Sequence, residues 1–433
     1  MRENWNDNRY EPDPQAQPRP EWDTRPAPAG RGNTGFWKGL LAGLLAAALV
    51  AGLAAGVSLI RTRTSYAGDQ TSGESVLDAE TIEKVHLLEQ YIDECYLDED
   101  QLTEEQMESG IYKGLLEALG DPYSVYYTEE EYKSLTEQTS GEYGGIGAYI
   151  GTNQDTGYAI ISGVFDGSPA AEAGLQAGDI FYKVDDEEVL GMTPDEIVSR
   201  VKGPENTSVH LTMIREGAAD YIEADITRKI INAPTVNSEM IDERIGYLQI
   251  SEFYNVTPGQ FDQALAELRD QGAKGLIIDL RGNPGGTVTA VTEIAGRMLP
   301  EGLVFYMEEK DGKRTEYTCR GADFDMPLVV LVDGYSASAS EILSGAIQDA
   351  GIGTIVGTQT FGKGIVQNIY PLDDGTAIKL TVAKYFTRNG QDIHKVGITP
   401  DVVVEFDSEA YQKDETDNQK DKAVEILTKE LGG

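Results

Sequence analysis

The amino-acid sequence predicts an α/β fold, because short apolar runs alternate with segments of helical periodicity through its second half. Residues 245–250 and 275–280 are expected to be buried strands, and residues 257–270 between them are expected to form a helix. A third apolar run at 326–332 precedes another helical segment, whose apolar residues share one face: Ile342, Leu343, Ala346, Ile347 and Ala350. We therefore expect one α/β core within residues 230–407.

The composition limits what the chain can bind. Its 433 residues have room for two or three domains, and 74 Asp and Glu against 35 Lys and Arg give a formal net charge of −39. Such a chain is repelled by nucleic acid and by anionic lipid head groups. Cys95 and Cys319 lie far apart without metal-ligand spacing, so we expect two free thiols, or at most one bridge, and no metal site.

The N-terminal part predicts a membrane anchor. Residues 1–35 are polar and contain six prolines, which predicts a disordered cytoplasmic tail. Residues 39–60 are 22 positions without a charge, enough to cross a bilayer, so a transmembrane helix is predicted at 36–60. Basic residues are more numerous before this run than after it, which predicts a single-pass protein of the cell membrane with an extracytoplasmic catalytic part. A cleaved signal peptide is the alternative, because Ser65-Tyr66-Ala67 resembles a cleavage site.

The segments on either side of the core show helical periodicity. Residues 61–140 are expected to form a helical region, with a second helix around 111–119, that packs or forms a homodimer and carries no chemistry. Residues 408–433 are expected to be a charged tail with a loose surface helix at 422–431.

A tight turn carrying Ser336, Ser338 and Ser340 joins the strand at 326–332 to the helix after it. The unpaired N–H groups and the dipole at a helix N-terminus stabilise negative charge, so this position suits a nucleophile. Ser338-Ala339-Ser340-Glu341 is also a capping box, in which Ser338 would only cap the helix.

Lys363 lies in a segment that lacks acidic residues. None occurs between Asp349 and Asp373, and the neighbours of Lys363 are glycines and apolar side chains. Desolvation disfavours the charged form of a lysine. Service as a base near neutral pH requires its pKa to fall by about three units, or about 4 kcal/mol. If the chain after Lys363 is extended, Ile365 and Gln367 share its face, and the Gln367 amide could orient the amine.

Residues 336–341 and 360–367 together resemble the motifs of the C-terminal (tail-specific) processing peptidases, which are serine proteases with a Ser/Lys dyad. The resemblance implies that Ser338 is the nucleophile, Lys363 the general base and Gln367 its orienting partner. It also implies a ClpP/crotonase-like protease core at 230–407.

The same resemblance assigns the oxyanion hole. Residues 281–286 follow a predicted strand and read Arg-Gly-Asn-Pro-Gly-Gly, without the GxxxxGK[ST] pattern of a phosphate-binding loop. In the family this loop supplies one backbone N–H, which leaves both Gly285 and Gly286 as candidates. The residue after the nucleophile, Ala339, supplies the other.

Residues 141–229 resemble a PDZ domain through the segments 143–150 and 168–180. The candidate peptide-binding residues are Gly145, Ile146, Gly147 and Ala148. Glycines let backbone N–H groups converge on a carboxylate, and an open strand edge can accept a peptide as a further strand. The alternative is that these glycines only form a tight turn.

These patterns predict a membrane-anchored serine endopeptidase that recognises the free, mostly apolar C-termini of protein substrates through its PDZ domain. No cofactor, metal or nucleic-acid partner is expected. A non-catalytic PDZ scaffold and a carrier of hydrophobic ligands are the alternatives, and the presence of both motifs argues against each.

Overall fold

The protein is represented by a computed structural model that describes residues 78–322 and 324–432. The described residues divide into two compact units. The first comprises residues 78–122 and 406–417, and the second comprises residues 123–405, with the gap at 323, and 418–432.

The first unit is helical, as its periodicity predicts. It contains α2 (Ala79–Cys95), the short 3₁₀ helix η1 (Glu99–Gln101), α3 (Glu104–Glu117) and α10 (Ser408–Asp414). Thr103 begins α3 through a capping box, in which its side chain accepts from the Gln106 N–H and the Gln106 side chain accepts in return. Several large apolar side chains of this unit are exposed, among them Leu87, Leu97 and Leu115.

The fold class predicted above needs one correction, which concerns the transmembrane helix. Among the residues that the structure describes, no helix is long and apolar enough to cross a membrane. The longest, α2, has 17 residues, fewer than the roughly 20 apolar residues that a span needs, and it carries several charges. The predicted span itself, residues 36–60, lies outside the described residues, as does the predicted tail at 1–35. The observed fold is a mixed α/β fold.

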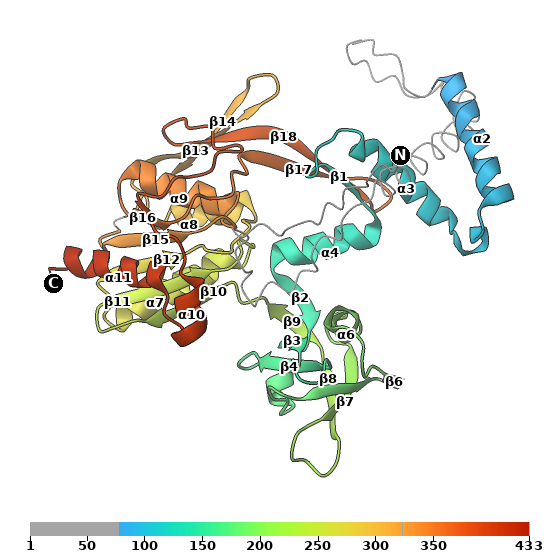
Figure 1. Cartoon of the computed structure of the whole chain (residues 1–433), viewed down its shortest axis with the longest axis horizontal. Coiled ribbons are helices and arrows are strands. Elements are labelled where there is room, and N and C mark those ends of the chain that lie inside the picture. The colour runs from blue at the N-terminus through green and yellow to red at the C-terminus, as the bar shows by residue number, and fades with distance from the viewer. Residues whose placement is uncertain (1–77, 323, 433) are drawn as a thin grey trace, which may run out of the picture. The chain divides into compact units, whose positions relative to one another are not determined.

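The second unit is built on a six-stranded sheet with the strand order β10-β11-β12-β15-β16-β19 (Figure 1). All neighbouring pairs from β11 to β19 are parallel, and β10 is an antiparallel edge strand. The bounds are β10 (Val236–Met240), β11 (Ile245–Ile250), β12 (Gly275–Asp279), β15 (Leu328–Val332), β16 (Thr354–Gly357) and β19 (Val402–Val403). The strands expected around 245, 275 and 326 are thus confirmed.

Helices cover both faces of this sheet because its strands carry apolar side chains on both faces. Leu276 and Ile278 face a core shared with α7 (Thr257–Asp270), α8 (Val288–Ala295) and α9 (Ala339–Ala350). Ile277 faces the other way, toward α11 (Asn418–Glu430). The segment expected to be a loose surface helix is therefore packed, with two fully buried residues, Ala423 and Leu427.

A second, antiparallel sheet lies on the other side of α8 and α9 (Figure 1). Its order is β1-β18-β13-β14, and β17 also pairs with β18. The bounds are β1 (Val125–Tyr127), β13 (Gly302–Glu309), β14 (Arg314–Cys319), β17 (Ile365–Pro371) and β18 (Ala377–Thr387). β1 pairs with a strand far along the chain, with Val125 opposite Lys379.

The predicted PDZ region has a core of its own. Its sheet has the order β3-β4-β5-β7-β8, with β6 on β5. The bounds are β3 (Ala148–Thr152), β4 (Ala159–Val164), α5 (Pro169–Glu172), β5 (Ile180–Val184), β6 (Glu187–Glu188), α6 (Pro194–Val201), β7 (Ser208–Ile214) and β8 (Ile222–Thr227). The chain enters and leaves this region through two paired strands, β2 (Glu142–Gly145), which follows α4 (Glu129–Ser140), and β9 (Lys229–Asn232).

Candidate active site

Four neighbouring parallel strands end at one edge of the large sheet, and the segments after them carry the candidate residues. Phe253 follows β11, the glycine pair 285–286 follows β12, Ser338 follows β15 and Lys363 follows β16. Because these strands are parallel and adjacent in the order β11-β12-β15-β16, their carboxyl ends lie side by side. Open α/β sheets place their ligand sites at this edge.

The structure distinguishes Ser338 from the two serines beside it. Ser336 is fully buried and donates its hydroxyl to the Leu280 carbonyl at 2.8 Å. Ser340 is also fully buried and donates to the Asn283 carbonyl at 3.0 Å. Ser338 is only partly buried. Two serines thus fasten the turn to the loop after β12, and the one between them is accessible.

The backbone at Ser338 is strained. Its φ of 55° and ψ of −111° lie outside the regions that residues with a Cβ usually adopt, at a cost of about 1–3 kcal/mol. Ser338 is the N-cap residue of α9, but it lacks the extended backbone usual for a simple N-cap. Its carbonyl accepts from the Tyr385 hydroxyl at 3.0 Å and from the Ile342 N–H at 2.9 Å. Surrounding groups therefore hold the strained turn in place.

Glu341 joins the turn of Ser338 to the loop of Lys363. It is fully buried, and its Oε2 accepts the N–H groups of Ser338 and Lys363, both at 2.9 Å. Its Oε1 accepts from the Thr360 hydroxyl at 2.6 Å and from the Gly362 N–H at 2.7 Å. One carboxylate therefore fixes the separation between the two segments that carry the candidate dyad.

The side chains of Lys363 and Gln367 have other contacts in this structure. The Lys363 Nζ lies 4.4 Å from the centroid of the Tyr123 ring. The Gln367 Nε2 donates to the Thr381 Oγ1 at 3.2 Å. Lys363 precedes β17, and the pairing of β17 with β18 shifts register between Val366 and Gln367. The extra residue of this bulge is Val382 of β18, because Val366 lies opposite Ala383 and Gln367 lies opposite Thr381, so residues 365–367 of β17 keep their alternation.

The glycine pair after β12 packs directly against the turn that carries Ser338. A Cβ added to Gly285 would lie 2.7 Å from the Ala337 carbonyl oxygen and 2.9 Å from the Ala339 nitrogen. The Gly285 N–H donates to the Asn283 Oδ1 at 2.8 Å, and Gly285 is buried. Gly286 is exposed. The two glycines are therefore not equivalent as donors to a substrate.

Burial perturbs two titratable groups close to these loops. It raises the pKa of the Tyr385 hydroxyl well above its usual value, so this group stays protonated and can donate to Ser338. It raises the pKa of the Glu252 carboxyl to about 7. Glu252 directly precedes Phe253, whose N–H donates to the Gly285 carbonyl at 2.9 Å.

The candidate peptide-binding residues of the PDZ region lie between β2 and β3. Gly147 has a φ of 76°, and its carbonyl accepts from the Ser168 hydroxyl at 2.9 Å. The Ile146 carbonyl accepts from the Ala170 N–H at 2.8 Å. The two segments on which the PDZ resemblance rests are therefore bonded to each other. Ala148 begins β3, and β3 is an edge strand of its sheet.

Two residues of the site were not predicted as functional. Glu341 was visible only as part of a capping box, and its contacts to the loop of Lys363 have no sequence-local signal. Asn283 lies in the glycine-rich loop 281–286, in which only Gly285 and Gly286 were predicted to have a role. Both residues are polar and fully buried, and this burial becomes visible only in the structure.

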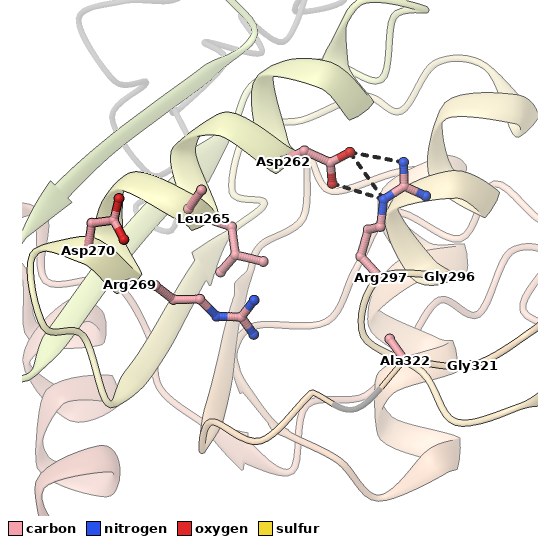
Figure 2. Close-up of a pocket in the computed structure, with 9 residues that line it drawn as sticks. Asp262, Leu265, Arg269, Asp270, Gly296, Arg297, Gly321 and Ala322 are labelled. Carbon is pink, nitrogen blue, oxygen red and sulfur yellow. Dashed lines mark hydrogen bonds and ion pairs between the residues drawn. The ribbon is translucent and has the colours of Figure 1, made fainter.

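A separate surface groove of about 530 Å³ is lined by α7 and by the turns after α8 and β14 (Figure 2). Arg297 lies across it and pairs with Asp262, with an Nε–Oδ1 distance of 2.9 Å. The Nη2 of Arg269 lies 3.8 Å from the Oδ1 of Asp325. The groove shares no residue with the candidate site, so it takes no part in the chemistry derived below.

The fold and the site together fit one class of protein, a serine-type peptidase that carries a PDZ domain. Residues 244–404 match Peptidase family S41, and residues 160–215 match the PDZ domain. The chain is 40% identical over 321 residues to the carboxyl-terminal-processing protease of Synechocystis sp., which covers 72% of this chain and 75% of that protein. The chain therefore belongs to the carboxyl-terminal processing proteases of peptidase family S41.

A further relative agrees with this assignment. The chain is 38% identical over 299 residues to the carboxy-terminal processing protease CtpA of Bacillus subtilis, covering 69% of this chain and 64% of that protein. It also resembles the solved structure of a photosystem II D1 C-terminal processing protease, with 30% identity, a TM-score of 0.43 and coverage of 74% of this chain and 86% of that one. The predicted family and the predicted class of enzyme are confirmed.

Proposed function

We propose that this enzyme cleaves protein substrates with Ser338 as the nucleophile and Lys363 as the general base. The observation that carries the proposal is the accessibility of Ser338 in a strained turn, while Ser336 and Ser340 on either side are buried and bonded to backbone. The Glu341 carboxylate, which binds the N–H groups of Ser338 and Lys363, supports the pairing of the two segments.

The reaction is an acyl transfer. Neutral Lys363 takes the proton of Ser338 as its Oγ attacks the scissile carbonyl, and the protonated lysine then gives that proton to the leaving amine. Water then attacks the ester carbonyl while Lys363 removes one of its protons, and the protonated lysine returns that proton to the Ser338 Oγ as the carboxyl product leaves. The contact of Lys363 with the Tyr123 ring favours a protonated amine, so the amine must leave the ring before it can act as a base. Gln367 would orient it after leaving Thr381.

The oxyanion would be held by the N–H groups of Ala339 and Gly286. Ala339 is the first residue of α9, where N–H groups lack intrahelical partners. Gly286 is favoured over Gly285 because Gly286 is exposed, while the Gly285 N–H already donates to Asn283. Donors fixed before the reaction stabilise the developing negative charge most effectively.

Substrate selection would fall to the PDZ domain. An extended C-terminal segment would add to the free edge of β3, and the backbone around Gly145, Ile146, Gly147 and Ala148 would receive its carboxylate. Apolar side chains of the tail would supply most of the remaining affinity.

We also propose that the helical unit mediates a homodimer. Its exposed Leu87, Leu97 and Leu115 are 49%, 91% and 62% accessible, and large apolar side chains that gather on one unit commonly mark an interface. Sedimentation velocity with Leu97→Lys and Leu115→Lys tests this, since an unchanged sedimentation coefficient would contradict it.

The catalytic proposal is tested by incubating the full-length protein with a loosely folded protein that ends in an apolar tail. Cleavage should be lost in Ser338→Ala and Lys363→Ala, retained in Ser340→Ala as the matched serine control, and slower when the substrate's terminal carboxylate is amidated. Equal cleavage by the parent, Ser338→Ala and Lys363→Ala would refute the dyad. Cleavage that is insensitive to amidation would refute carboxylate capture by the PDZ domain.

A further inference from the structure

We infer that Asn283 is a positioning residue that sets the oxyanion hole, an inference that rests on the proposed role of Ser338. Asn283 contacts neither the nucleophile side chain nor the space of a substrate. It acts through Gly285 and through the turn of Ser338, as its hydrogen bonds show.

The side chain of Asn283 uses both ends of its amide. It is fully buried, its Nδ2 donates to the Ile250 carbonyl at 2.8 Å, and its Oδ1 accepts the Gly285 N–H at 2.8 Å. Ile250 is the last residue of β11, so the amide joins the end of that strand to the glycine pair after β12. Both contacts need an amide in one orientation, because one end must donate and the other must accept.

The backbone of Asn283 fastens the same loop to the nucleophile turn. Its carbonyl accepts from the Ala337 N–H at 3.0 Å and from the Ser340 hydroxyl at 3.0 Å. These two partners lie on either side of Ser338 and Ala339. One residue therefore connects the end of β11 and the turn after β15 to the loop after β12, the same loop that contains the proposed oxyanion donor Gly286.

The consequence concerns which N–H faces the substrate. Asn283 holds the N–H of Gly285 in the interior, and the chain then continues to the exposed Gly286. The two glycines have φ values of 105° and 148°, and their segment is held on one side by the Phe253 N–H, which donates to the Gly285 carbonyl at 2.9 Å, and on the other side by Asn283. Without the Oδ1 acceptor, the Gly285 N–H loses its buried partner and the peptide can reorient. Oxyanion donors must lie within about 2.7–3.1 Å of the developing charge, so reorientation removes stabilisation of the transition state.

The experiment uses the full-length protein, the apolar-tailed substrate and four variants: Asn283→Ala, Asn283→Asp, Asn283→Ser and Gln260→Ala. Asn283→Ala should lower kcat by about 10²-fold with KM within about twofold, the size seen when one oxyanion donor is lost. Asn283→Asp should recover at least about tenfold of that loss, because a carboxyl oxygen still accepts the Gly285 N–H.

Gln260 is the matched control because its half-buried side chain makes the same kind of contacts between α7 and the segment before β10. Its Oε1 accepts the Thr235 N–H at 2.8 Å, and its Nε2 donates to the Ala233 carbonyl at 2.8 Å. Gln260→Ala should lose stability in urea without a change in kcat beyond about threefold.

The inference is overturned if Asn283→Ala lowers kcat no more than Gln260→Ala at equal loss of stability, or if the loss appears in KM alone. If Asn283→Ala does not fold, the comparison of Asn283→Asp with Asn283→Ser tests the role, because the Asp side chain reaches the Gly285 N–H and the shorter Ser side chain does not. Equal kcat values in these two variants would refute the role of Asn283. Ser338→Ala distinguishes a failure of the proposed function from a failure of this inference. Activity in Ser338→Ala refutes the proposed function, whereas an inactive Ser338→Ala beside an Asn283→Ala variant with the kcat of the parent refutes only the role of Asn283.

Discussion

Replacement of Glu341 gives the sharpest test of how the two segments that carry the proposed dyad are held together. Its two carboxylate oxygens accept four hydrogen bonds, and the residue has no exposed surface. A buried donor left without a partner costs about 1–3 kcal/mol. Glu341→Ala leaves four donors unpaired, or roughly 4–12 kcal/mol, against a total stability of about 5–15 kcal/mol for a typical domain. We expect this variant not to fold.

Glu341→Gln is the informative variant because it has the same shape with one donor end. The amide nitrogen should turn toward Thr360, whose hydroxyl can accept as well as donate. Only the Gly362 N–H then faces another donor, and the contacts to Ser338 and Lys363 remain. We expect the free energy of unfolding in urea to fall by about 1–3 kcal/mol. We also expect kcat to fall by less than about tenfold.

The control is Asp179→Asn, which changes a buried carboxylate of the PDZ domain that pairs with Arg215. It should lower the stability of that domain and leave kcat on a short peptide unchanged. Wild-type stability and wild-type kcat in Glu341→Ala would refute the reasoning, because the four hydrogen bonds would then contribute nothing.

Three further predictions concern titration and backbone geometry. Burial raises the pKa of Glu252 from 4.5 to about 7, so the native state binds the carboxyl proton more tightly than the unfolded state does. The free energy of unfolding should therefore fall by roughly 3 kcal/mol as pH rises from 4.5 past 7. Urea titrations at several pH values should show this fall in the parent and not in Glu252→Gln. The pKa of His210 is raised chiefly by its hydrogen bond to Asp225, so its NMR titration midpoint should lie above 6.5 and should move down in Asp225→Asn. The interaction of protonated His210 stabilises the fold at low pH, and this stabilisation is lost as pH rises through the midpoint. Gly286→Ala should lower both kcat and the free energy of unfolding, because its φ is 148° and a Cβ there would overlap the Phe253 carbonyl. Gly259→Ala is the control: a Cβ at this position of α7 meets open space, so neither kcat nor the fold should change.

Continuous apolar runs made much of the protease core predictable. The strand at 245–250 and the helix at 257–270 have the bounds expected from sequence, because both combine a strong apolar pattern with clear ends. The spacing of the serine and lysine motifs indicated the correct family before any contact was known. These signals lie within short sequence segments, so they can be interpreted without knowing which segments meet in the fold.

Features that depend on distant segments were out of reach. The Lys363 amine lies over Tyr123, about 240 positions earlier in the chain, and no pattern near Lys363 indicates this. The register shift at Gln367 arises from an extra residue in the partner strand β18, and nothing near Lys363 in the sequence indicates it. The packing of helix α11 was underestimated because most of its residues are charged or polar, and its three buried residues, Gln419, Ala423 and Leu427, form no strong apolar pattern in the sequence.

The paired strands β2 and β9 have a consequence for the modular construction of the enzyme. Because Glu142 lies opposite Asn232, the two ends of the PDZ insertion meet, and the host chain continues almost where it left off. Loop-closure entropy changes by only about 0.6 kcal/mol for each doubling of loop length. The stability of the protease core should therefore depend little on the length of chain between these two strands. A short hairpin could replace the entire domain, and a different recognition domain could be inserted through the same ribbon.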